Sequence, residues 1–220
     1  MRKTIGLLLL LLPGAGAAAM NQISFNFGRG LPLSAVAAGS RSDVEGARGS
    51  NCSLDVLHKV SGLFYLGADN GWFHSKDNLS QTFLPNATTA LSSKATSIFI
   101  LGRMDFPTTS KLVPYLVAGG GWVRNSLAMT ATPTSPWTDT GTSESRTFLD
   151  QTRNSAGYVA GFGMDLALTD RLFFGVEARY QGSKKQSFDL TPAGVSALGH
   201  TSVYASVNTY LLGLRVGFQY

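Results

Sequence analysis

The last nine residues constrain the fold of this chain most, because apolar and non-apolar side chains alternate strictly along them. Apolar residues occupy every second position from Leu212 to Tyr220, and glycine, arginine and glutamine fill the positions between them. A period of two residues is typical of a β-strand with two different faces. One face suits hydrocarbon and the other suits small and polar neighbours, which predicts a strand that closes a transmembrane β-barrel.

The first residues have the pattern of an export signal. Arg2 and Lys3 form a positive start, an apolar run follows over residues 5–12, and small residues then offer cleavage sites. The apolar run is too short for a transmembrane helix, so an uncleaved anchor is the weaker alternative. We therefore predict a signal peptide at residues 1–19 and one barrel domain at residues 20–220.

Composition excludes several classes of function. The net charge of +5 is small and scattered, which argues against a nucleic-acid partner. The only cysteine, Cys52, excludes an internal disulfide framework. Three dispersed histidines and this cysteine give no metal-ligand spacing, so we predict neither a metal nor a cofactor.

Alternation predicts eight strands joined by connections of alternating length. The predicted strands are 23–28, 54–60, 63–73, 97–106, 113–123, 158–168, 172–181 and 202–220. Long polar segments separate the strand pairs at 29–51, 75–95, 127–154 and 183–200, whereas short turns join the strands within each pair. This rhythm predicts an all-β, eight-stranded antiparallel up-and-down barrel with both chain ends on the periplasmic side. An exported β-sandwich is the alternative, but it needs two apolar faces that meet in a dry core.

The strand faces also predict the contents of the lumen. A charge on the lipid face costs about 2–4 kcal/mol near the midplane, so charged positions must face inward. The predicted lumen network is Arg103, Asp105, Asp165, Glu177, Arg179 and Arg215, with Asp69 as a weaker candidate. Trp122 has the same inward parity in this interpretation. An eight-stranded barrel has room only for side chains, so we predict a plugged lumen. Aromatic residues predicted at the membrane interfaces are Tyr115, Tyr210, Phe218 and Tyr220.

Two segments carry a resemblance to a known family, and the end of the chain resembles an assembly signal. The segment from Pro114 to Trp122 resembles the fifth strand of the small OmpA-like, opacity-type outer-membrane barrels, and the segment from Gly161 to Tyr180 resembles their sixth and seventh strands. The end of the chain, with Phe218 and Tyr220, resembles the signal read by the outer-membrane assembly machinery. The resemblance implies the outer membrane of a Gram-negative bacterium, and contact with its lipids, including lipopolysaccharide.

The resemblance leaves three functions open, because the family includes surface adhesins, immune-evasion proteins, structural barrels and narrow channels. We expect a non-enzymatic barrel whose polar loops serve contact with a surface or host ligand, or envelope integrity. A narrow channel for small or apolar solutes is the alternative. A lipid A-modifying enzyme ranks last: His200 and Ser202 have a suitable spacing, but no acidic residue follows to complete a catalytic set. We therefore predict no catalytic residues.

Overall fold

The computed structural model describes residues 21–32, 35–38, 41–45, 49–79, 87–137, 141–206 and 208–220. The predicted signal peptide at residues 1–19 lies outside these residues. Within them, no helix is both long and apolar enough to span a bilayer.

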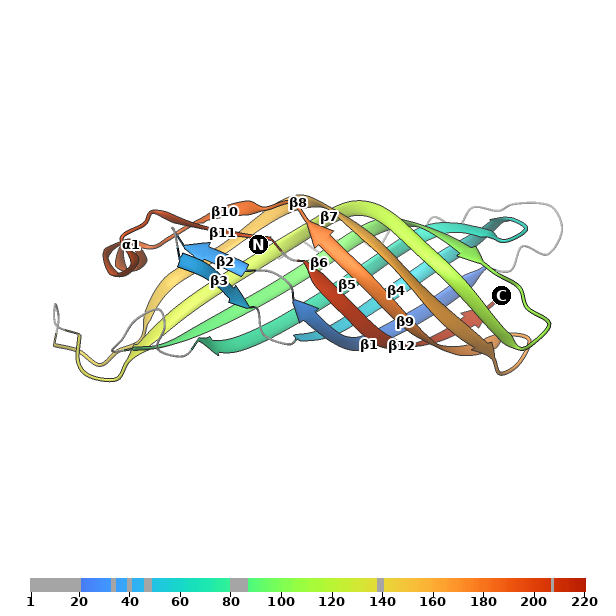
Figure 1. Ribbon diagram of the computed structural model, residues 1–220, viewed down its shortest axis with the longest axis horizontal. Helices are drawn as coiled ribbons and strands as arrows, with labels where there is room; N and C mark the ends of the chain where they lie inside the picture. The colour runs from blue at the N-terminus through green and yellow to red at the C-terminus, as the bar shows by residue number, and fades with distance from the viewer. Residues whose placement is uncertain are drawn as a thin grey trace, which may run out of the picture.

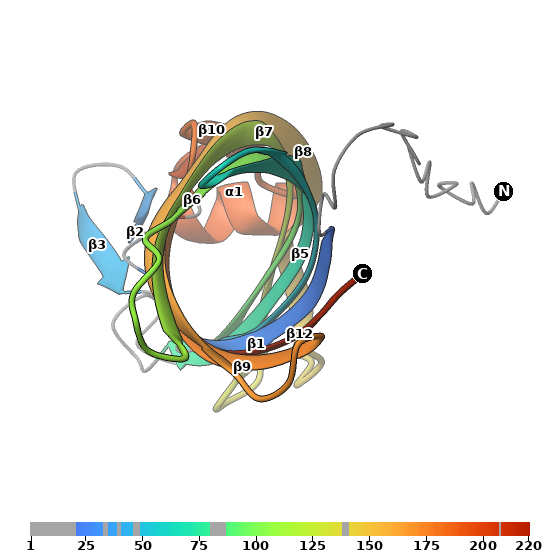
Figure 2. The ribbon, with the colours of Figure 1, turned by 90° about the vertical axis from the view of Figure 1, so that its right-hand side faces the viewer.

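Eight antiparallel strands of the described chain close into one barrel, which confirms the predicted fold class (Figures 1 and 2). Their bounds are β1 Gln22–Pro32, β4 Gly49–Ser61, β5 Phe64–Leu79, β6 Ala87–Asp105, β7 Leu112–Pro133, β8 Arg146–Ala167, β9 Leu172–Ser183 and β12 Thr209–Gln219. The first strand pairs with the last, so the barrel has no open edge. Closure satisfies the backbone hydrogen bonds that hydrocarbon cannot satisfy.

The strand register fixes the stagger of the barrel. From Thr209 on β12, successive pairing partners around the barrel lead back to Gln219 on the same strand, a displacement of ten residues. Strands in such barrels tilt by about 35–45°, and an eight-stranded barrel has an interior that side chains fill. Because of the stagger, residues at equal height on neighbouring strands are displaced by roughly one position from direct pairing partners.

The short connections and the described chain ends lie at the same end of the barrel. Asn21 and Tyr220 exchange two backbone hydrogen bonds of 2.9 and 3.0 Å there. The turns at 62–63, 106–111 and 168–171 join β4 to β5, β6 to β7 and β8 to β9. In barrels of this kind short turns face the periplasm, so we refer to this end as the periplasmic end.

A cap of additional secondary structure lies at the opposite end, on the left in Figure 1. Its four-stranded sheet contains β10 Gln186–Asp189, β11 Ser202–Ala205, β2 Ala35–Ala38 and β3 Arg41–Glu45. The helix α1, Pro192–Leu198, begins at the N-cap Thr191 and ends at Gly199, which has a left-handed backbone. The helix packs against β8 through Ala193, Val195 and Leu198, next to an apolar cluster.

Two sequence predictions about this end are wrong. The segment 202–220 is not one strand, because β11 pairs with β10 and β2 in the cap and the barrel strand begins only at Thr209. The segments 75–95, 127–154 and 183–200 are not plain loops, because they contain extensions of β5 to β8 and the elements β10 and α1. In the extensions of β6 and β7, apolar residues such as Leu91, Leu127 and Met129 are buried inside, and hydroxyl residues such as Thr88 and Thr132 are exposed outside, so the composition of these segments resembles that of a polar loop.

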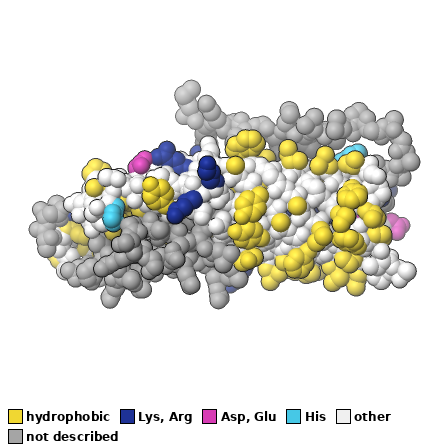
Figure 3. Space-filling view, turned by 45° about the horizontal axis from the view of Figure 1, so that its top comes forward, with side chains coloured by type: hydrophobic (Ala, Val, Ile, Leu, Met, Phe, Trp, Pro, Cys, Tyr) yellow, Lys and Arg dark blue, Asp and Glu magenta, His cyan; other side chains and the backbone are white. Residues whose placement is uncertain are grey.

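The barrel wall therefore reverses its polarity partway along the strands. On β6, Ile98 and Ile100 are exposed on the outside while Arg103 is buried inside. Further from the periplasmic end, Lys94 is exposed outside and Leu91 is buried inside. Figure 3 shows the same division: apolar side chains gather over the right half of the visible surface, and Lys and Arg lie to their left. The apolar half forms a band that suits a bilayer, and the other half suits water.

Candidate functional site in the barrel lumen

The structure places the six predicted lumen residues inside the barrel. Arg103 and Asp105 come from β6, Asp165 from β8, Glu177 and Arg179 from β9, and Arg215 from β12. Arg215 is fully buried, and the most exposed of the six side chains, that of Asp105, is 13% exposed. Alternation places these side chains inward because the opposite positions on the same strands carry apolar residues.

Arg179 is the centre of one half of the network. Its guanidinium forms ion pairs with Asp55 on β4 at 2.5 Å and with Asp69 on β5 at 2.8 Å, and it also contacts Glu177. Asn26 donates a further hydrogen bond of 2.9 Å to Asp55. Since β5 lies opposite β9 in the strand order, these contacts cross the lumen.

Asp165 is the centre of the other half. One of its oxygens, Oδ2, accepts from Arg103 Nη2 at 2.8 Å and from Arg215 Nη1 at 2.5 Å. Arg103 also pairs with Asp105, and Arg215 donates to Ser24 Oγ on β1 at 3.0 Å. Two arginines from different strands are thus held by one carboxylate, which fixes the relative positions of β6, β8 and β12.

Tyr115 connects the two halves, and the prediction that it lies at the membrane interface is wrong. Its side chain is buried in the lumen, and its hydroxyl donates to Glu177 at 2.8 Å. The Arg103 guanidinium lies 3.7 Å from the centre of its ring, a cation–π contact. The inward parity predicted for Trp122 is also wrong, because this side chain is 72% exposed on the outer face. Both errors arise on β7, whose two faces carry similar small and apolar residues.

The other predicted interface aromatics lie on the outer surface. Tyr210 is 53% exposed, and Phe218 and Tyr220 are about half exposed at the periplasmic end. Tyr180 lies between Tyr158 and Tyr210, with ring centres 5.8 and 5.2 Å away. Trp122 pairs with Ala156, two residues from Tyr158, so with the stagger of the barrel it lies near the height of these three tyrosines, at the boundary between the apolar band and the polar surface.

Sequence reasoning missed Asp55 and gave Asp69 only a weak place in the network. Both are buried, and both hold Arg179. The parity of β4 contains the signal for Asp55, since Leu54 and Val56 flank it on the opposite face. A carboxylate between two lipid-facing residues must point into the lumen.

An apolar layer fills the lumen on the cap side of the charges. It consists of Phe73, Ala95, Phe99, Val123, Val159 and Leu211, whereas Leu57, Tyr65, Leu101 and Val117 of the same cluster lie among the charged side chains. A second apolar cluster follows beneath the cap, with Phe148 and Phe188 both 1% exposed. Charged, apolar and capped layers thus succeed one another along the axis.

Three observations on the described residues concern metal binding and catalysis. They contain no group of three or more His, Cys, Asp or Glu side chains arranged to hold a metal ion. The lumen carboxylates are engaged by arginines, which removes them as free general bases. His200 and Ser202 lie in the cap, where His200 is exposed and Ser202 begins β11.

Comparison with known proteins identifies the fold. No protein-family model and no curated protein sequence matches this chain. Among solved structures, the outer membrane protein OprG from Pseudomonas aeruginosa has a TM-score of 0.56 at 14% identity, covering 92% of this chain and 96% of OprG. Neisserial surface protein A gives 0.48 at 16% identity, covering 91% and 98%. The outer membrane protease OmpT from Escherichia coli gives 0.46 at 12% identity, covering 92% and 96%.

Proposed function

We propose that this chain is an integral outer-membrane β-barrel with a non-conducting lumen, and that its function is to present the cap at the surface of a Gram-negative bacterium. The fold is that of small outer-membrane barrels, as the similarity to OprG indicates. A fold does not define an activity, so the function must be argued from the site. The cap is the part suited to meet a host or surface ligand, while the barrel anchors it.

One observation carries this proposal: ion pairs cross the lumen from wall to wall. Arg179 on β9 reaches Asp55 and Asp69 on the far side, and Asp165 joins arginines from two other strands. A charge removed from water is stabilised only by close partners, so such pairs resist separation. The apolar layer beside them disfavours a continuous water path, because apolar constrictions lose water.

The remaining residue assignments belong to the same proposal. We assign Arg103, Asp105, Asp165, Glu177, Arg179 and Arg215, together with Asp55 and Asp69, to a network that locks strand register and closes the lumen. Tyr210, Phe218 and Tyr220 anchor the outer face at the membrane interfaces. Phe218 and Tyr220 serve as the signal for the outer-membrane assembly machinery, and outer-membrane lipids, lipopolysaccharide included, surround the barrel.

Planar-bilayer conductance tests the proposal. Purified, refolded protein should add no current above the lipid baseline, while a large general-diffusion porin in the same bilayers shows that the assay detects channels. Heat-modifiable gel mobility of the same preparation establishes that the barrel has folded. A reproducible open-channel current would replace the proposal by the narrow-channel function. Altered lipid A acylation on overexpression would replace it by the enzymatic one.

A further inference from the structure

Three basic side chains lie on neighbouring strands, on the cap side of the apolar band. They are Lys76 on β5, Lys94 on β6 and Arg124 on β7, and all are exposed on the outer face. Lys94 pairs directly with His74, and Arg124 pairs with Thr96. Because of the barrel stagger, Lys76 and Arg124 lie near the height of Lys94 rather than their direct partners. The three therefore form a cationic row, parallel to the membrane, over three neighbouring strands.

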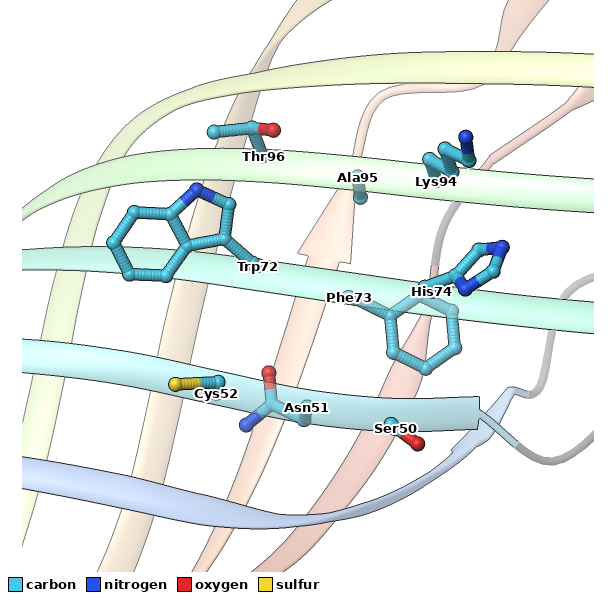
Figure 4. A pocket seen from close by; sticks show the side chains of 9 residues that line it. All are labelled: Ser50, Asn51, Cys52, Trp72, Phe73, His74, Lys94, Ala95 and Thr96. Atoms are coloured by element: carbon cyan, nitrogen blue, oxygen red, sulfur yellow. The ribbon is translucent and has the colours of Figure 1, made fainter.

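A groove of about 440 Å³ lies on the same strands. Trp72, Cys52 and Thr96 line its membrane side, and His74 and Lys94 line its cap side. Figure 4 shows the Trp72 indole and the Lys94 amine at opposite ends of this set of side chains. The groove thus has an apolar end toward the band and a basic end toward water.

The basic row is not neutralised within the described part of the chain. The ion pairs found there involve Arg103, Arg153, Arg179 and Arg215, and none involves Lys76, Lys94 or Arg124. Diagonal neighbours on adjacent strands are about 7–8 Å apart, a distance that long side chains can close around one anion. Lys94 and Arg124 are diagonal neighbours of this kind, because Lys94 pairs with Ser126 on β7.

Exposed apolar side chains continue from the groove toward the periplasmic end. Ile98 and Ile100 are 53% and 68% exposed on β6, and Leu116 is 48% exposed on β7. Trp72 and Trp122, at 45% and 72% exposed, stand between these residues and the basic row. A molecule that matched this surface would have an anionic head beside the basic row and a hydrocarbon tail along the band.

We propose that the basic row binds the phosphate headgroup of an anionic lipid in the outer leaflet, with its acyl chains along Ile98, Ile100 and Leu116. Lys94 and Arg124 contact the phosphate, Lys76 adds to the local positive potential, and Trp72 and Trp122 flank the junction of head and tail. The inference rests on the proposed function, because it requires the apolar band to lie in the membrane. A basic residue near a membrane surface adds about 1 kcal/mol to anionic lipid binding, and a close pair to phosphate is stronger.

The basic row and the adjoining apolar surface together determine which class of molecule fits this site. A soluble anion would match the basic row but leave the apolar surface without a partner. A zwitterionic lipid would match the apolar surface, but its own cation would repel the row. Only an anionic lipid matches both parts, and a lipid is present wherever the band is embedded.

Native mass spectrometry of the full chain in detergent, with a bis-phosphorylated glycolipid as the probe, tests the inference. The test variant is K94E with R124E, and the matched control is K111E with R171E, which makes the same charge change at exposed positions in the periplasmic turns. Wild type and control should retain the lipid, and the test variant should bind it at least roughly tenfold more weakly. Phosphatidylcholine should bind all three proteins equally, and inorganic phosphate should not displace the glycolipid.

Two outcomes would refute the proposed lipid site. Equal glycolipid binding by test and control variants would refute the site. Displacement by millimolar inorganic phosphate would show a phosphate site without lipid specificity, which also refutes it. Heat-modifiable mobility of all three proteins shows that each barrel has folded, so a failure of the lipid site can be distinguished from a failure of the proposed function. A chain that does not form the barrel contradicts the proposed function itself.

Discussion

At the scale of single residues, Arg179 has the largest share of the lumen network. It is almost fully buried and pairs with carboxylates from β4, β5 and its own strand. Its removal breaks the ion pairs of Asp69 and Glu177 and leaves Asp55 with the longer contact of 4.0 Å to Arg215. Breaking a buried pair is far more costly than losing an exposed charge, because the remaining partner stays out of water.

We therefore expect Arg179→Ala to lower the free energy of unfolding by about 3–5 kcal/mol. Lys185→Ala is the matched control: Lys185 is exposed and lies 5.5 Å from the Tyr204 ring, so its loss should change stability by less than about 1 kcal/mol. Urea unfolding in lipid vesicles, followed by tryptophan fluorescence, measures both. Equal stability of the two variants would show that the network does not support the barrel.

At the scale of elements, the sequence predicts the part of each strand that crosses the apolar band. Strict alternation predicted β9 and the end of the last strand from Leu212 to Tyr220, because one face there must meet lipid, although the predicted start at residue 202 is wrong. It did not predict the extensions of β6 to β8 toward the cap. On β7, for example, Leu127, Met129 and Ala131 point inward there, and serine and threonine point outward. Composition alone makes such a segment resemble a polar loop.

The same reasoning explains which site residues could be predicted. Arg103 and Arg179 lie on strands whose faces contrast, so parity places them inside. Tyr115 and Trp122 lie on β7, where glycines and apolar residues occupy both faces and parity gives no direction. Contacts such as Arg179 with Asp69 join residues far apart in sequence, and only the closed barrel brings them together.

The cap should unfold independently of the barrel. Phe148 is 1% exposed, lies in the cluster beneath α1 and contacts the Trp137 ring at 6.3 Å. Phe148→Ala should destabilise this packing by about 3–5 kcal/mol and speed hydrogen exchange in α1 and β11. The exposed neighbour Thr147 provides the control, as Thr147→Ala. Faster exchange throughout β9 and β12 in the Phe148 variant would contradict separate cap and barrel stability.

At the scale of the whole molecule, two arrangements of polarity follow one another along a single set of strands. Near the periplasmic end, apolar side chains face out and charges are paired inside. Near the cap, basic and hydroxyl side chains face out and apolar residues fill the interior. On β7, the outward band from Leu112 to Trp122 spans roughly 25 Å along the axis, which matches the apolar height of outer-membrane barrels.

A spin-label scan along the outer face of β6 tests this reversal of polarity. Single cysteines at Thr88, Ala90, Ile98 and Ile100, in a Cys52→Ser background, place labels on both sides of the boundary in protein reconstituted into vesicles. Labels at Ile98 and Ile100 should relax with oxygen, which concentrates in lipid, and those at Thr88 and Ala90 with a water-soluble nickel complex. Equal access of the nickel complex to all four sites would contradict a membrane-embedded band.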